Sequence, residues 1–366
     1  MLRMALVLPL IILLLCTSIY ASPTVKLGSS IEDSELGELE DLARDKYNIN
    51  LKELISEIIK GDLDFSNLTD KLTDLLIGEV KKNSSFMSKI LLICILNGIL
   101  ASTMEGFAKG GTDKIIYFAS YTAVASMLVS GFKACINTLV NGIEEITEII
   151  NAGIPLILCI ATAAYGGGTA LSFGSVLSLG VGILNDLISK IIVPQIIFCV
   201  MLGILNCLWD RDRVGRLSEL FAFLSTWEIR LCAFIFVGSL TLSRMGTASA
   251  LAGKGVRLAV GAVPVVGGLF ENSLEAVVSF IDALKGGAGA VIIIIILFTA
   301  IVGLAKLCIV MLMFKLTAAL SEPIGSKQIT QMIDCAGEGV KLLIGVYFTV
   351  AIMFITALSV MLAAFN

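Results

Sequence analysis

The sequence contains no histidine among its 366 residues, and only 15% of them are charged. Histidine is the most common metal ligand in proteins and the usual general base near neutral pH. Its absence excludes most zinc sites and histidine-dependent catalytic triads. No pair of acids and no Ser–Lys dyad stands out within the apolar segments, so we expect no catalytic residue, no cofactor and no metal, and the chain is not predicted to be an enzyme.

The shortage of charge accompanies an apolar composition, with 57% hydrophobic residues and a mean hydropathy of +0.96. Soluble domains carry about 25% charged residues. Because apolar runs recur along most of the chain, the solvent to consider is the lipid bilayer, which helices can span. The composition therefore predicts an all-α, polytopic helical membrane protein. No basic stripe is present to bind phosphates, so no nucleic-acid partner is expected.

The nine cysteines are scattered, and no CxxC pair occurs among them. Almost all of them lie inside apolar stretches, where a free cysteine behaves as a small hydrophobic residue. The sequence therefore predicts neither a metal site nor a disulfide framework.

Residues 1–21 have the order of a signal peptide. A single charge at Arg3 precedes an unbroken apolar run from Met4 to Leu15, and small or polar residues stand at Thr17, Ser18, Ala21 and Ser22. This order predicts export and cleavage after Ala21. The alternative is an uncleaved membrane anchor at the same position.

Residues 22–86 form the only long polar region. Between Ser22 and Ser85 there are 8 Lys or Arg residues against 14 Asp or Glu residues, which gives a net charge of −6. Apolar residues recur there at helical spacing, which predicts two or three short amphipathic helices on the extracytoplasmic side. These apolar residues are Leu51, Leu54, Ile55, Ile58, Ile59, Leu68, Leu72, Leu75, Leu76 and Val80.

Residues 87–366 are predicted to form a helical membrane domain of seven or eight spans, because a span needs about 20 apolar residues. The predicted spans are 88–107, 115–135, 149–165, 170–189, 191–208, 217–242, 288–313 and 340–364. Glycines recur between residues 166 and 182. The third and fourth predicted spans therefore could form a hairpin that does not fully cross the membrane. Residues 256–270 are predicted as a re-entrant element, which is tolerated where it is buried in protein or lines a cavity.

The distribution of charge between these spans predicts their orientation. Alternation from an exported amino-terminal region places Lys109 to Lys114 and the Trp209 to Arg216 turn inside, and Ile136 to Glu148 outside. The turn carries Arg211 and Arg213, in agreement with the positive-inside rule. Residues 243–285 are assigned outside, although they contain both basic and acidic residues.

A few motifs could carry chemistry. Gly253-Lys254-Gly255 lacks the spacing of a phosphate-binding loop, and Glu144 with Glu148 is best interpreted as a solvated acidic face. Lys306 is the strongest signal, because it interrupts an apolar run, and a charge within a span usually faces the protein interior. It either reaches the membrane surface at a helix break or faces a polar interior.

The order of these features resembles the stage III sporulation protein AE family. The resemblance covers most of the chain from Ile90 to Asn366. It is carried by Val193-Pro194, the Trp209-Asp210-Arg211-Asp212-Arg213-Val214 turn, Val263-Pro264-Val265-Val266-Gly267, Lys306 before Phe314-Lys315-Leu316, and Glu322-Pro323-Ile324-Gly325. Within these motifs the candidate structural or functional residues are Lys306, Pro264, Gly267, Pro323, Gly325, Arg211 and Arg213.

The resemblance implies a non-enzymatic subunit of the complex that joins the mother cell to the engulfed forespore in endospore-forming bacteria. Its expected location is the mother-cell membrane around the forespore. Its expected partners are sister sporulation membrane proteins of the same operon, a ring component on the forespore side, and the lipid bilayer. The alternative is a self-contained secondary transporter of a small solute, which the glycine-interrupted spans would suit.

Overall fold

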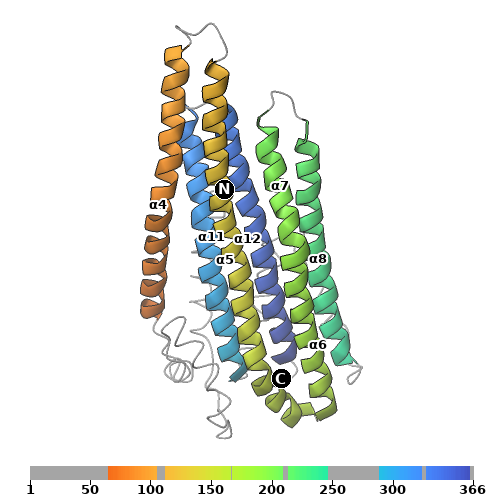
Figure 1. Ribbon diagram of the computed structural model, residues 1–366. Helices are drawn as coiled ribbons and strands as arrows, with labels where there is room; N and C mark the ends of the chain where they lie inside the picture. Colours follow the sequence, from red (N-terminus) through yellow and green to blue (C-terminus); the bar gives the residue numbers. More distant parts are fainter. Residues whose placement is uncertain are drawn as a thin grey trace.

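The computed structural model describes residues 65–104, 112–165, 167–208, 213–245, 288–323 and 327–362. Within these ranges there are helices and short turns and no strand, so the predicted all-α fold is confirmed. The helices run side by side in a long bundle (Figure 1). They are α4 (Phe65–Met104), α5 (Thr112–Tyr165), α6 (Gly167–Leu187), the π-helix η1 (Ile188–Ile192), α7 (Val193–Asn206), α8 (Gly215–Met245), α11 (Ala288–Ser321) and α12 (Lys327–Leu362).

Five of the described helical stretches are long and apolar enough to cross a membrane. They are Phe118–Ile154, Leu177–Asn206, Gly215–Ser239, Ile295–Ser321 and Lys327–Leu358. The prediction of a polytopic helical membrane protein is therefore confirmed.

The prediction of separate spans at 115–135 and 149–165 was wrong, because α5 is one helix of 54 residues. Residues 136–148 between them were predicted to form an outside connection. They hold polar residues, but their apolar residues keep the helical period and face the bundle core. Three of these, Leu139, Ile143 and Ile146, are buried, as is Ile150 just beyond them.

The predicted break between spans 170–189 and 191–208 is also absent. Helix α6 continues through the π-helix η1 into α7, and Pro194 stands in the first turn of α7. Proline lacks the N–H that an α-helix uses for its backbone hydrogen bond, and a π-turn before it changes the local bonding pattern. Two pairs of predicted spans are thus single helical runs, which reduces the eight predicted spans to six. The predicted span 88–107 lies in α4, which is not among the five candidate spans of the described residues.

Helix α4 runs without interruption across residue 86, so part of the polar region shares a helix with the first predicted span. The extracytoplasmic position of residues 22–86 stays a prediction. The signal peptide at 1–21, the apolar stripe at 51–59 and the re-entrant element at 256–270 lie outside the described residues.

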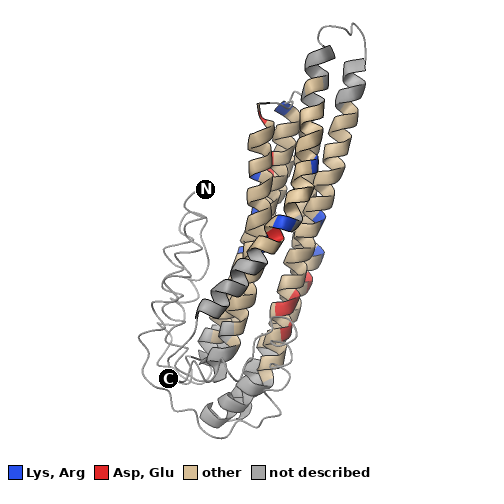
Figure 2. Ribbon diagram, turned by 90° about the vertical axis from the view of Figure 1, so that its left-hand side faces the viewer, with Lys and Arg blue, Asp and Glu red and all other residues tan. Residues whose placement is uncertain are grey.

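The helix ends alternate between the two ends of the bundle as predicted, although two pairs of predicted spans are merged. The carboxyl ends of α4, α7 and α11 and the amino ends of α5, α8 and α12 lie together at the upper end in Figure 1. Removing two breaks shifts the alternation by an even number, so the end of α4 and the end of α7 still lie on one side of the bundle. Figure 2 shows that most of the described ribbon carries no charged residue, as a membrane-embedded bundle requires.

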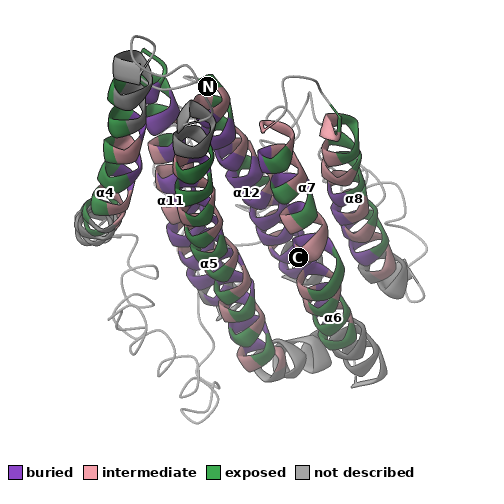
Figure 3. Cartoon of the chain, turned by 45° about the horizontal axis from the view of Figure 1, so that its top comes forward, coloured by how far each residue is buried: buried purple, intermediate pink, exposed green. Residues whose placement is uncertain are grey.

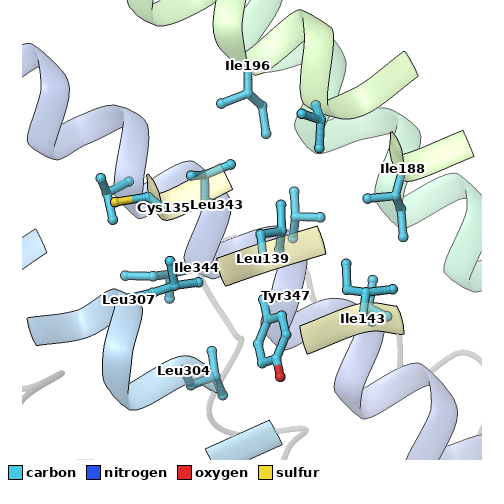
Figure 4. Packing of buried hydrophobic residues seen from close by; sticks show 14 of the residues in the cluster. Cys135, Leu139, Ile143, Ile188, Ile196, Leu304, Leu307, Leu343, Ile344 and Tyr347 are labelled. Carbon is cyan, nitrogen blue, oxygen red and sulfur yellow. The ribbon is translucent and has the colours of Figure 1, made fainter. Parts of the chain in front are cut away.

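Helix α12 packs against α5, α7, α8 and α11. Figure 4 shows apolar side chains from α5, η1, α7, α11 and α12 gathered in one cluster, with Tyr347 of α12 among them. The Tyr347 hydroxyl donates a hydrogen bond of 3.3 Å to the Thr299 carbonyl oxygen of α11. Its ring fits between Gly142 and Gly303, where a Cβ atom on Gly142 would lie 2.6 Å from Tyr347 Cε2. Small residues therefore let three helices approach around one aromatic ring.

Gly303→Ala should destabilise the bundle by about 1–3 kcal/mol, because the added methyl group meets the ring of a fully buried tyrosine. Gly345→Ala is the matched control, since a Cβ there has no neighbour within 4 Å. Thermal unfolding of the two variants in detergent measures the difference. Equal unfolding temperatures would show that Tyr347 does not set the helix spacing.

Candidate functional site: polar networks within the apolar bundle

In the described part of the chain, two networks that include charged side chains join helices to one another, and both lie between helices that cross the membrane by length and composition. The first joins α11 to α12. Lys315 Nζ lies 2.6 Å from Asp334 Oδ1 and 2.7 Å from Glu338 Oε1, and Lys341 Nζ lies 3.0 Å from Glu338 Oε2. Two ammonium groups thus face two carboxylates, and their formal charges cancel.

Lys315 is the centre of this network. Its side chain is only 17% exposed, whereas those of Asp334, Glu338 and Lys341 are 51%, 46% and 52% exposed. The aliphatic part of Lys315 passes over Gly337, where a Cβ would lie 3.4 Å from Lys315 Cε. The network therefore ties α11 to α12 near the end where these helices are connected, and it leaves its carboxylates accessible from outside the bundle.

The second network joins α7 to α8. Gln195 Nε2 donates a hydrogen bond of 2.9 Å to Glu228 Oε1, and Ser225 Oγ donates one of 3.2 Å to Gln195 Oε1. The other carboxylate oxygen, Glu228 Oε2, is buried without a hydrogen-bond partner. Interhelical hydrogen bonds of this kind hold helices together in a membrane. The network can orient α8 on α7, and it leaves Glu228 Oε2 as an acceptor without a donor.

The cysteines of the described part are free. Cys94, Cys135 and Cys199 are buried and the remaining four are half-buried, as expected of small hydrophobic residues. At the end of α7, burial raises the pKa of the Cys207 thiol, and the nearby Asp334 carboxylate raises it further. A thiol with a raised pKa is a poor nucleophile near neutral pH.

The predicted site residues do not come together in one place. Lys306 lies within the continuous helix α11, half-buried, so the proposed helix break beside it is absent. Arg213 and Pro323 are exposed near the end of the bundle where α7 meets α8 and α11 meets α12. Arg211, Pro264, Gly267 and Gly325 lie outside the described residues, and the roles of all seven stay predictions.

A capping interaction explains how the turn before α8 is held. Asn206 Oδ1 accepts hydrogen bonds of 3.0 Å from the backbone N–H groups of both Arg213 and Val214. The side chain of the last residue of α7 thus fixes the start of α8. The exposed Arg213 side chain is presented at this end of the bundle.

Sequence reasoning missed the residues of both networks. Asp334, Glu338 and Lys341 follow one another at spacings of four and three, which places them on one helix side. That signal was available, but Lys315 is nineteen residues from Asp334, and only the packing of α11 on α12 shows the pair. Within the described ranges no group of three or more Cys, Asp or Glu residues is arranged to hold a metal ion. The geometry of the networks suits helix association and charge neutralisation.

Comparison with known proteins gives a consistent result. The profile of the family described as stage III sporulation protein AE matches residues 49–364. A relative from Bacillus subtilis (strain 168), named stage III sporulation protein AE, is 24% identical over 353 residues, which cover 93% of this chain and 88% of the relative. No solved structure matches the chain. Since the family profile covers most of the sequence, the chain belongs to the stage III sporulation protein AE family.

Proposed function

We propose that the chain is a non-enzymatic, membrane-spanning subunit of the channel-like or secretion-like complex that joins the mother cell to the forespore. The observation that carries the proposal is a bundle of five apolar helices in a member of a sporulation family. Its two polar networks lie between helices and act as structural ties. A role in sporulation follows from the family, and membership of the complex is the proposed step.

The proposed location is the mother-cell membrane around the forespore, with the region after the signal peptide in the space between the two membranes. Sister membrane proteins of the same operon and a ring on the forespore side are the proposed partners. The alternation of helix ends supports this orientation, because Arg213 and Arg216 lie at the end assigned to the cytoplasm.

The orientation gives a direct prediction. A reporter fused after Arg213 should report the cytoplasm, and one inserted after Met245, at the opposite end of α8, should report the outside. Alkaline phosphatase is active only outside the cytoplasm, and a fluorescent protein is active inside it. Fusions of each reporter at both positions show on which side of the membrane the position lies. Reversal at both positions would overturn the orientation and the predicted export of the amino-terminal region.

The proposal is tested by removing the gene from its host and restoring it. Loss of heat-resistant spores after normal engulfment, with unchanged vegetative growth, is the expected result. A growth defect on a particular nutrient without a spore defect would favour the alternative, a secondary transporter of a small solute. The π-helix that interrupts the α6–α7 run is the feature that suits this alternative, because transporters bind solutes at irregular helical segments.

A further inference from the structure

The outward side of α5 is polar from Thr122 to Asn151. Eleven residues between 122 and 151 are exposed, and every one of them is polar or alanine. They are Thr122, Ala123, Ser126, Ser130, Lys133, Ala134, Asn137, Asn141, Glu144, Glu148 and Asn151. The nine polar residues recur at spacings of three or four, so they form one stripe on the helix, which we call the α5 polar stripe.

The α5 polar stripe is longer than a membrane is thick. Its 30 residues from Thr122 to Asn151 extend over about 45 Å at 1.5 Å per residue, whereas the hydrocarbon core of a bilayer is about 30 Å thick. Wherever a core of this thickness lies within the candidate span Phe118–Ile154, polar side chains of the stripe therefore reach across most of it. This distinguishes the stripe from a polar cap at one membrane surface.

Helices α6, α7, α8 and α11 expose many large apolar residues instead, whereas α12 is mostly buried and, among its described residues, exposes only polar residues and Gly345. Exposed large apolar residues include Leu179, Ile183, Phe198 and Met201 of α6 and α7, Leu220, Phe223, Trp227 and Phe234 of α8, and Leu312, Leu316 and Leu320 of α11. On α5, Phe118 alone among the described residues belongs to this class. Figure 3 shows exposed residues along the length of α5, which lies at the front of the bundle in Figure 1. The bundle as a whole is thus amphipathic.

Lipid cannot be what covers the α5 polar stripe. Lys133, Glu144 and Glu148 are all exposed on it, and charged side chains within a membrane face the protein interior or water. The stripe lies on the outer surface of the described helices, so these helices of one copy do not enclose the water that the stripe requires. The stripe needs further protein around it, with a polar face of the same length.

We propose that several copies of the chain turn α5 toward a common axis, so that their polar stripes line a water-filled conduit across the membrane. This inference rests on the proposed function and names the part of the subunit that forms the passage. A second copy is the partner that offers a polar face of matching length, and closed symmetry is the usual outcome of such an arrangement. Thr, Ser and Asn side chains line most of the passage, with one lysine and two glutamates from each copy, so small hydrophilic molecules are the class it admits.

Cysteine substitution tests the inference in membrane vesicles from sporulating cells that carry the full chain. Ser126→Cys, Asn137→Cys and Asn141→Cys place thiols on the stripe, and Ile183→Cys, Leu220→Cys and Leu316→Cys place them at exposed apolar positions. A charged, membrane-impermeant thiol reagent reacts with thiolates in water, so the stripe positions should react at least about tenfold faster than the apolar ones. The parent chain, whose described cysteines are buried or half-buried, gives the background.

Oxidative cross-linking of the same variants tests the arrangement of copies. Only variants that restore spore formation are compared. Disulfide-linked dimers are expected from the stripe variants and not from the apolar controls. Equally slow labelling at stripe and control positions would overturn the conduit. Fast labelling without cross-linking would overturn the arrangement of copies around an axis. Either failure would leave the proposed function standing, because that function is judged by spore formation after gene removal.

Discussion

Deleting residues 51–59 is expected to abolish spore formation while leaving the chain in the membrane. The spans of the described bundle begin at Phe118, so insertion does not need this segment. Its apolar stripe of Leu51, Leu54, Ile55, Ile58 and Ile59 needs a cover, and a region of roughly 60 residues buries only about 60% of its chain surface when it folds alone. The net charge of −6 between Ser22 and Ser85 disfavours an anionic lipid surface, which attracts basic segments.

A protein face is therefore the expected cover, and the deletion should remove a docking surface. The variant should be found in the membrane fraction at normal amounts, and its spore count should fall to that of a strain without the protein. A deletion of equal length over residues 26–34 is the control, since it lies before residue 49, where the family match begins. Normal spores after loss of 51–59 would show the segment to be dispensable.

Lys306→Leu is expected to impair spore formation more than Lys109→Leu, even though the first change should favour membrane insertion. A lysine at the centre of a span costs about 2.5–3.5 kcal/mol of insertion free energy. Lys306 lies half-buried in α11 between the buried residues Ala305 and Leu307, so leucine fits the surroundings better. Lys109 lies outside the described residues, in a segment that the sequence places at a membrane edge where solvent is available.

The two substitutions separate stability from function. Quantitative blotting of membranes should show equal or higher amounts of the Lys306→Leu protein, while heat-resistant spores decrease. Lys306→Arg retains the charge and should restore a large part of the spore count. Equal spore counts for the leucine variants at 306 and 109 would show that the charge at 306 has no role.

The class of fold could be predicted from composition alone, because low charge and recurring apolar runs leave only a helical membrane architecture. The extent of single helices could not. The polar residues from Asn137 to Glu148 resembled a connection, but they form one side of a helix whose opposite side, with Leu139, Ile143 and Ile146, is buried. A segment of this kind is distinguished from a loop only when its apolar period of three to four is counted.

The polar networks could be predicted only in part. Asp334, Glu338 and Lys341 lie at helical spacing in the sequence, whereas their contact with Lys315 depends on how α11 packs against α12. Gln195 and Glu228 are likewise thirty-three residues apart and meet through the packing of α7 on α8. Contacts between helices depend on their relative rotation and height, which local sequence patterns do not specify.

The most direct test of the account is purification of an affinity-tagged full-length chain from the membranes of sporulating cells at the end of engulfment. The account predicts that sister membrane proteins of the same operon are recovered with it in fixed proportion, and that they are lost when residues 51–59 are deleted. The same chain tagged in a strain that lacks those sister genes gives the background. Recovery of the functional tagged chain alone, at full spore counts and under conditions that keep membrane complexes intact, would contradict the claim that it is a subunit of an assembly.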